Sequence, residues 1–307
     1  MAFRENRRLG AALAFRKDCA WYGVLEQRDG ELILSDADRI EVPSGLTDGE
    51  RLFDGRGLGL FLRKKLKFRW GSLPLAVGIP SSECFFSLMP MPVKDSGEAL
   101  ASLQWNFEDF FPFSYEESLC SLCPVQLPPS RGGSGEPFGR RNRLFLGAAC
   151  RRERVLPLLE SLKRGKCRVF AAEPQIVAAA RALSPFREQQ SRLIVLCGES
   201  AWHIAFLCDA SGVLFRSIPY DGALFAESLE GEVRRTLDYA EERFLVSRPV
   251  MTLTGVPDRT APLWERSFFQ NFSAAEPKNF YEVAAEPPAD EENFDLLGLL
   301  LRFYHED

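Results

Sequence analysis

Histidine and metal-binding patterns are scarce in this chain of 307 residues, which contains two histidines, His203 and His305. Cys120 and Cys123 form an isolated Cys-x-x-Cys pair, and neither a second pair nor a histidine accompanies it at zinc-site spacing. Most of the eight cysteines lie inside apolar runs, where reduced thiols act as small buried hydrophobes. We therefore expect no metal site.

The sequence also lacks a long apolar run and an excess of positive charge. The apolar stretch from Phe294 to Tyr304 is too short to span a membrane and contains Arg302. The N-terminal residues MAFRENRRLG are not followed by the apolar core and cleavage site of a signal peptide. A net charge of −5 and a pI near 5.4 argue against a nucleic-acid-binding protein. These absences predict a protein that is made and kept in the cytosol.

What the sequence does contain is the composition of a folded protein, with 46% hydrophobic and 26% charged residues. Its length suits about two domains. In the most informative stretch, 193–219, two turns separate three apolar or alternating segments, which predicts a meander. Residues 223–244 then repeat apolar side chains at helical spacing, which predicts a long helix.

A hairpin or a second three-strand meander is predicted near the N-terminus, over residues 9–34. A short basic helix follows at 58–68, and we interpret its cationic side as a solvent-exposed face rather than a membrane or partner contact. Further strands are predicted at 75–79, 84–89 and 119–127, and a Pro/Gly/Ser/Arg-rich loop at 128–142.

The helix predicted at 96–111 is rich in aromatic residues. Ser96 can cap its start, and Pro112 ends it. Trp105 and Phe111 fall outside its apolar stripe, so this helix carries more aromatic surface than one core contact needs. Exposed aromatic side chains are common binding anchors, although both could instead be buried.

The rest of the chain alternates strands and helices. Residues 144–183 predict a strand–helix–strand–helix unit whose second helix starts at Pro174. A short buried strand is predicted at 250–254, and helices are predicted at 263–269 and 293–304.

Three local stretches and the order of these elements match a known pattern. The segment WNFEDFFPF at 105–113 resembles a helix that ends in an aromatic residue, a proline and a phenylalanine. Residues 147–183 resemble a strand–helix–strand–helix segment, and LFRSIPYDG at 214–222 resembles the strand and turn after a second phosphate loop. Together they resemble the type IV pilus assembly protein PilM family, related to the cell-division protein FtsA, from about residue 9 to residue 303.

The resemblance implies the actin-like ATPase (RNase H-like) fold. This is an α/β fold with two halves, each with a mixed sheet and helices, here with an inserted α+β subdomain. The implied domains are the first half at 1–70, the inserted subdomain at 71–170, a return to the first half at 171–190, and the second half with a C-terminal helix at 191–307.

An actin-like ATPase needs two glycine turns around the phosphates and an aspartate in each to hold Mg²⁺ or its waters. By resemblance, the aspartate and glycine positions of the first turn fall on Ala12 and Ala14. The aspartate position of the second turn falls on Leu196, whereas Gly198 is retained. Both expected carboxylates are therefore replaced by apolar side chains.

The turn that would lie under the adenosine is also altered. Gly255 remains there, but Val256 and Pro257 replace the glycines expected after it. Asp18 and Glu199 are the nearest acidic residues that could take over the metal. We expect no bound ATP or Mg²⁺ and no ATPase activity.

The resulting hypothesis is a non-catalytic scaffold. By resemblance it would sit on the cytoplasmic side of the inner membrane and bind the cytoplasmic tail of a PilN-like membrane protein, in pilus, secretion or DNA-uptake assembly. In the PilM family that tail lies in a groove beside the inserted subdomain, and we expect Trp105 and Phe111 to be near it. The alternatives are a nucleotide-binding actin-like ATPase and a stand-alone relative of the type II secretion L protein cytoplasmic domain.

Overall fold

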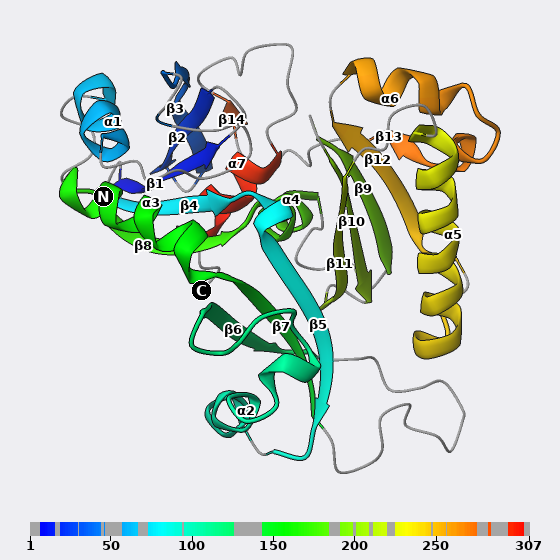
Figure 1. The fold of residues 1–307 in the computed structure, drawn as a ribbon. Coiled ribbons are helices and arrows are strands. Elements are labelled where there is room, and N and C mark those ends of the chain that lie inside the picture. The colour runs from blue at the N-terminus through cyan, green and yellow to red at the C-terminus, as the bar shows by residue number, and fades with distance from the viewer. Residues whose placement is uncertain are drawn as a thin grey trace. The chain divides into compact units, whose positions relative to one another are not determined.

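The chain forms two compact units, drawn in Figure 1. Unit 1 consists of Met1–Glu83, Glu153–Leu183 and Glu276–Asp307, and unit 2 of Cys84–Arg152 and Ser184–Ala275. The structure is a computed structural model. It describes residues 7–15, 19–29, 31–43, 46, 57–66, 73–93, 95–125, 143–183, 191–198, 201–208, 211–219, 225–246, 248–255, 257–274, 282–283 and 294–303.

Unit 1 is built on a six-stranded sheet with the order β14-β3-β2-β1-β4-β8. Strands β1, β2 and β3 form an antiparallel meander, which confirms the meander predicted near the N-terminus. Strand β4 pairs in parallel with β1, and β8 pairs in parallel with β4. The strands are β1 (Arg7–Phe15), β2 (Cys19–Arg28), β3 (Glu31–Glu41), β4 (Pro74–Ile79), β8 (Arg168–Pro174) and β14 (Glu282–Val283).

Four helices belong to this unit: α1 (Leu58–Leu66), α3 (Arg152–Arg164), α4 (Gln175–Leu183) and α7 (Phe294–Leu300). Short 3₁₀ helices follow β4 at Ser81–Glu83 and α7 at Leu301–Phe303. Helix α7 and the 3₁₀ helix after it confirm the helix predicted at the C-terminus. Helix α7 packs on α4 and on strands β1, β2 and β4 (Figure 1).

Small residues let α7 approach its neighbours closely. A Cβ on Gly298 would collide with the backbone carbonyl of Ala178 in α4, so only glycine fits this helix contact. On the sheet, a Cβ on Gly23 would lie 3.1 Å from a methyl group of Leu300. At Gly10 it would overlap the ring of Phe303. The C-terminal segment therefore contacts α4 through its own Gly298 and contacts the sheet at Gly10 and Gly23.

Unit 2 contains a five-stranded sheet with the order β11-β10-β9-β12-β13. Its antiparallel strands β9, β10 and β11 confirm the meander predicted at 193–219. Strand β12 pairs in parallel with β9. The strands are β9 (Arg192–Cys197), β10 (Ala201–Cys208), β11 (Ser211–Pro219), β12 (Val250–Gly255) and β13 (Ser273–Ala274).

Helix α5 (Phe225–Phe244) lies against this sheet and confirms the long helix predicted at 223–244. Large side chains fill the core, including Trp202 and Phe206 from β10 and Leu229 and Val233 from α5. No helix within the described residues is long and apolar enough to cross a membrane.

The helix predicted at 263–269 is wrong in its bounds. Helix α6 runs from Pro257 to Trp264, and a 3₁₀ helix, Phe269–Asn271, follows after a turn. The start is explained by Pro257, because proline lacks a backbone N–H and has the helical φ that suits the first turn of a helix. The apolar spacing over 263–269 reflects burial of Leu263 and Phe269 in one core rather than one continuous helix.

A three-stranded antiparallel sheet, β5-β7-β6, completes unit 2. Its strands are β5 (Cys84–Met91), β6 (Ser118–Pro124) and β7 (Arg143–Arg151), and it packs with α2 (Ser96–Leu103) and the 3₁₀ helix Phe107–Asp109. Phe86 in β5 contacts Phe215 in β11, with ring centroids 5.1 Å apart. The loop predicted at 128–142 lies outside the described residues.

Helix α2 differs from the helix predicted at 96–111. Asp95, not Ser96, is its N-cap, because the Asp95 Oδ1 accepts hydrogen bonds from the backbone N–H groups of Gly97 and Glu98 at 2.8 and 3.0 Å. The helix ends at Leu103, and the following aromatic residues continue in turns and the 3₁₀ helix.

The boundaries of the inserted subdomain also differ from those predicted at 71–170. Strands β4 and β8, at its two ends, lie in the six-stranded sheet of unit 1. The compact units divide after Glu83 and after Arg152, and Cys84–Arg152 groups with the second half of the chain. The predicted strand–helix–strand–helix unit has the expected elements, but β7 and β8 belong to different sheets.

Candidate functional site

The positions of the first phosphate turn lie inside strand β1 and are closed by packing within unit 1. Ala12 and Ala14 are fully buried. Ala12 pairs with Gly23 in β2 and Ala76 in β4, and Ala14 pairs with Trp21 and Gly78. Directly paired residues share a face of the sheet. Both alanines therefore face the same side as Gly23, where helix α7 is seated.

The same side is packed near the end of β1. A Cβ on Gly78 would lie 2.9 Å from Cγ of Gln175 and 3.2 Å from a methyl group of Leu299. The Gln175 side-chain amide donates a hydrogen bond of 2.8 Å to the backbone carbonyl of Phe15. Helices α4 and α7 thus occupy the surroundings of Ala14. The possible substitute Asp18 lies outside the described residues.

The second phosphate turn follows strand β9. Leu196 is half-buried and pairs with His203 in β10 and Thr254 in β12. The N–H of Gly198 donates to the carbonyl of Ala201 at 3.0 Å. A Cβ on Gly198 would lie 3.1 Å from that carbonyl oxygen, so the turn itself favours glycine here without a phosphate. Glu199 lies outside the described residues.

Gly255, in the adenosine turn, also has a structural explanation. Its φ of +125° lies in a region that side chains rarely adopt. A Cβ there would collide with backbone atoms of Cys197 in the neighbouring strand. Glycine is needed at this position for β12 to pair with β9. Val256 lies outside the described residues, and Pro257 is the first residue of α6.

These positions do not fit MgATP. Mg²⁺ requires oxygen ligands in near-octahedral geometry, and Ala12 and Leu196 offer none in their side chains. The side chain of Ala14 occupies space where a glycine backbone would approach a phosphate, within a face that is already packed. The glycines that remain, Gly198 and Gly255, serve the local backbone.

His203 is held by a strand neighbour. Its Nδ1 lies 2.8 Å from the Oγ of Ser217 in β11, and the ring is buried. His203 is thus a strand residue whose ring has a hydrogen-bond partner. Ser200, three residues before His203 in the sequence, lies outside the described residues.

The cysteines show no metal or redox arrangement within the part of the chain that the structure describes. No group of three or more potential metal ligands is found there, and none of the eight thiols forms a disulfide. Cys120 and Cys123 lie in one strand, β6. Burial raises the pKa of the Cys120 thiol, against a hydrogen bond with Ser118 that lowers it, which keeps the thiol protonated.

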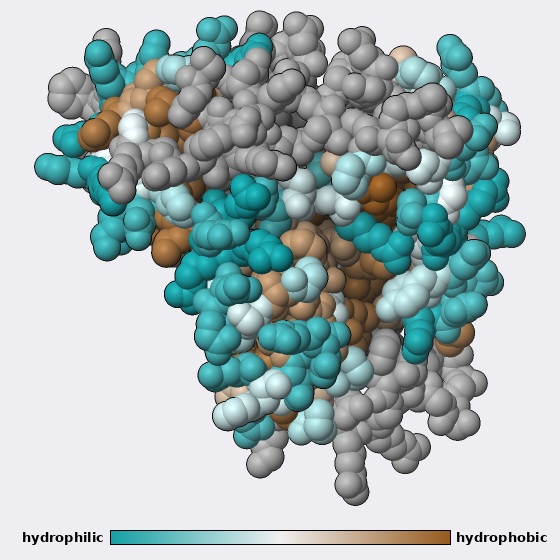
Figure 2. Space-filling view, in the orientation of Figure 1, coloured by the Kyte–Doolittle hydropathy of each residue, from teal (hydrophilic) through white to brown (hydrophobic). Residues whose placement is uncertain are grey.

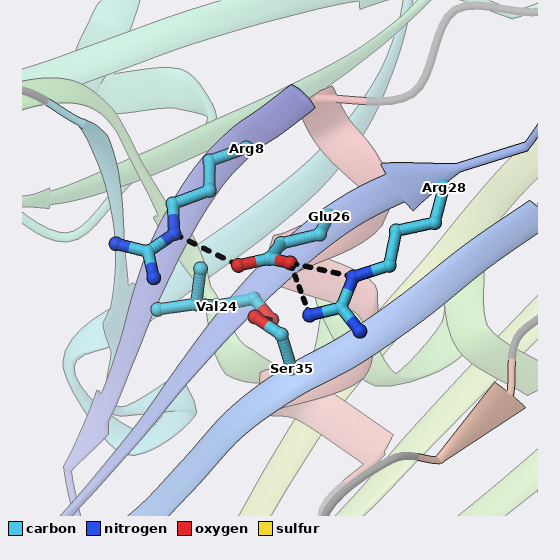
Figure 3. Close-up of polar contacts among 5 residues, drawn as sticks. All are labelled: Arg8, Val24, Glu26, Arg28 and Ser35. Atoms are coloured by element: carbon cyan, nitrogen blue, oxygen red, sulfur yellow. Dashed lines mark hydrogen bonds and ion pairs between the residues drawn. The ribbon is translucent and has the colours of Figure 1, made fainter. Parts of the chain in front are cut away.

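A buried carboxylate in unit 1, Glu26, holds two arginines together (Figure 3). Arg8 donates to Oε1 at 2.8 Å, and Arg28 donates to Oε2 through two nitrogens, at 3.0 and 2.8 Å. Burial raises the pKa of Glu26, but hydrogen bonds from Arg28, Arg8 and Ser35 outweigh it, so the pKa lies below its ordinary value. Glu26 is therefore an ionised structural group.

A second buried carboxylate, Glu173, ties the C-terminal segment to β8. Arg181 in α4 and Arg302 each donate to it at 2.6 Å. Arg181 also donates to the carbonyl of Gly298 in α7 at 2.8 Å. Both carboxylates are thus engaged in holding elements of unit 1 together.

The two predicted partner-binding aromatics separate in the structure. Trp105, just after the end of α2, is 83% exposed. Phe111 is 2% exposed and packs with Phe107 and Phe113 in the core of the three-stranded sheet. The proposal of Phe111 as a surface anchor is therefore wrong, because the chain leaves the helix at Leu103 and turns this ring inward.

Comparisons with known proteins establish the fold. No protein-family model and no curated protein matches the chain. A chain of the PilM–PilN type IV pilus biogenesis complex is similar, with a TM-score of 0.75 and 16% identity over 97% of this chain and 99% of that one. A Bacteroides thetaiotaomicron protein with an actin-like ATPase fold has a TM-score of 0.50 and 12% identity, over 95% of each chain.

The cytoplasmic domain of EpsL, an inner-membrane component of the Vibrio cholerae type II secretion system, gives a TM-score of 0.49 and 12% identity, over 95% of this chain and 93% of that one. The first two similarities confirm the predicted actin-like ATPase fold. The structural similarity to a chain of the PilM–PilN complex extends over nearly the whole of this chain.

Proposed function

We propose that this chain is a non-catalytic scaffold of a type IV pilus or related secretion or DNA-uptake assembly. The observation that carries the proposal is the similarity to a chain of the PilM–PilN type IV pilus biogenesis complex over 97% of this chain. The apolar, packed positions of Ala12 and Ala14 support the absence of ATPase activity, since a phosphate turn needs carboxylate and bare backbone there.

The partner in this proposal is the cytoplasmic tail of a PilN-like membrane protein. The chain would then work on the cytoplasmic face of the inner membrane, held there through that partner. Trp105 is our candidate anchor on this chain, because a large exposed aromatic side chain can bury much apolar area when a partner covers it.

The ATPase alternative has less support. Gly198 and Gly255 are the features that it would share with an active site, and both have backbone reasons to be glycine. The proposed scaffold binds its partner without nucleotide.

Co-purification of the full chain with a full-length PilN-like protein from the same organism tests the proposal. We expect a complex to form in detergent without added nucleotide. Trp105→Ala should weaken it by about 30-fold, the effect of losing a hot-spot aromatic worth about 2 kcal/mol. Leu245→Ala is the matched control, because Leu245 is also a large exposed apolar residue, 73% exposed, but lies at the end of α5. A complex that forms only with MgATP would contradict the proposal.

A further inference from the structure

Two basic runs that are far apart in the sequence meet in unit 1. The first is the last turn of α1, with Arg63, Lys64 and Lys65. The second spans the end of α3, the turn after it and the start of β8, where four of six residues are cationic: Lys163, Arg164, Lys166 and Arg168. We call these seven side chains the basic surface.

Close packing between α1 and α3 brings the two runs together. The N–H of Gly59 in α1 donates to the Oγ of Ser161 in α3 at 2.8 Å. A Cβ on Gly59 would collide with the Ser161 carbonyl, and a Cβ on Gly165 would lie 2.5 Å from the Gly59 carbonyl oxygen. This contact needs glycine on both sides.

The later part of α1 also lies near the second run. Burial raises the pKa of the Cys167 thiol to about 12, and the positive charge of Arg63 acts in the opposite direction, which requires Arg63 to be close to Cys167. Cys167 lies between Lys166 and Arg168 in the second run. The two runs therefore approach each other at Gly59 and at Arg63.

The cations of the basic surface are exposed, and among the described residues few of them have an ionic partner. All seven side chains belong to exposed residues. Arg164 lies 3.8 Å from Glu160 one helical turn earlier, a long surface ion pair. None of the other six has an ion pair with a carboxylate of the described residues. This concentration occurs in a chain with a net charge of −5, so the charge is strongly polarised.

Apolar side chains lie among these cations. Leu60 is 55% exposed and lies one turn before Lys64 on the outer side of α1. Phe61 is half-buried, and the ammonium of Lys65 lies 5.9 Å from its ring centroid. In the space-filling view, hydrophobic atoms where α1 lies are bordered by hydrophilic ones (Figure 2). Exposed leucine beside lysine is typical of helices at a membrane interface.

We propose that the basic surface binds the anionic headgroups of a phospholipid membrane, with Leu60 entering the boundary between headgroups and acyl chains. Clusters of this size suit acidic lipids, because each Lys or Arg near an anionic surface contributes about fivefold to binding. A nucleic acid shares the phosphate chemistry but makes no use of exposed Leu60. The negative remainder of the chain would be repelled by the membrane, which orients the basic surface toward it.

Vesicle sedimentation of the full chain, without any partner, tests this inference. We expect binding to vesicles of phosphatidylcholine and phosphatidylglycerol in equal parts, loss of binding at high salt, and none to phosphatidylcholine alone. Inorganic phosphate should reduce vesicle binding no more than sodium chloride does at the same ionic strength. Because no partner is present, this result is separate from the result of the PilN-like tail experiment.

Matched variants locate the effect. Lys64→Gln with Lys166→Gln should weaken binding by about 25-fold, since two basic contacts are lost. Arg243→Gln with Arg248→Gln changes the net charge equally, at exposed residues of unit 2, and should change binding by less than about twofold. Leu60→Ser should weaken binding by about tenfold, because its apolar burial is lost.

Three results would overturn the inference. The first is equal binding to both kinds of vesicle, and the second is unchanged binding of the Lys64 and Lys166 double variant. The third is a competition result, in which short duplex DNA releases the chain from sedimented vesicles at lower concentrations than added phosphatidylglycerol vesicles do. The last would assign the basic surface to nucleic acid instead.

Discussion

Each half of this fold begins with a meander that packs one face against a helix, and the two meanders use different side chains for this contact. In unit 1, the face of β1 and β2 under α7 carries the small residues Ala12, Ala14 and Gly23 beside one large ring, Trp21. In unit 2, the face of β10 under α5 carries Trp202 and Phe206. Helix α7, which contains Gly298, packs very close to the first sheet, whereas large aromatic rings lie between the second sheet and α5.

This difference bears on the two phosphate-turn positions. Ala12 lies on the tightly packed small-residue face and has no room for a larger polar group. Leu196 lies on the opposite face from Trp202, next to His203 and Thr254, and is only half-buried. We infer that the packing of unit 1 leaves no room for a carboxylate at position 12. In unit 2, a carboxylate at position 196 would replace one partly exposed side chain without disturbing the packing around it.

The largest expected effect comes from placing a carboxylate in each meander. Ala12→Asp should destabilise the chain by about 4 kcal/mol or more, because it buries an unpaired charge and overpacks α7. Leu196→Asp should cost about 1–2 kcal/mol, since its position is partly exposed beside polar neighbours. Urea unfolding of both variants measures the difference. Equal costs would show that the two faces are packed alike.

The packing of α7 is tested by a glycine pair. Gly298→Ala should destabilise by about 2–3 kcal/mol, because its Cβ meets the carbonyl of Ala178 and the helices must move apart. Gly231→Ala, in α5, should stabilise by about 0.5–1 kcal/mol, because a Cβ there meets no atom within 4 Å and alanine favours a helix. Thermal unfolding distinguishes the two; a stable Gly298→Ala variant would contradict the close α4–α7 contact.

The smallest effect concerns the ion cluster of the first meander. Glu26→Gln should cost about 1–2 kcal/mol at neutral pH, because charge-assisted hydrogen bonds from Arg8 and Arg28 are lost. The pKa of Glu26 is lower in the folded than in the unfolded chain, so its stabilisation is complete above the ordinary value of 4.5 and is lost as pH falls through the lower folded pKa. Unfolding free energies of the two proteins should therefore converge in acid. A constant difference across that range would assign the loss to packing.

Much of the fold could be predicted from the sequence where periodicity was strong. Both meanders and the helix at 223–244 alternate or repeat clearly, because each buries one face. Phe111 could not be placed this way: the helical spacing was extended past Leu103, and the turns that rotate its ring inward depend on contacts with Phe107 and Phe113. The predicted boundaries of the inserted subdomain differ from the observed ones because β4 and β8 pair with each other over a long sequence distance, which local sequence patterns do not show.

The phosphate-turn positions were predicted through resemblance, and only the structure explains them. The sequence shows alanine at 12 and 14, but not that α7 and α4 pack against that side of the sheet. Nor does it distinguish a glycine kept for a ligand from one kept for a strand contact, as at Gly255.

The central claim, that this actin-like fold works without nucleotide, is tested most directly by calorimetric titration of MgATP into the full chain. Because Ala12 and Leu196 provide no oxygen ligand for Mg²⁺, we expect only the heat of dilution, with no saturable binding. Saturable binding with micromolar affinity would contradict the account and would direct attention to Asp18 and Glu199 as replacement ligands.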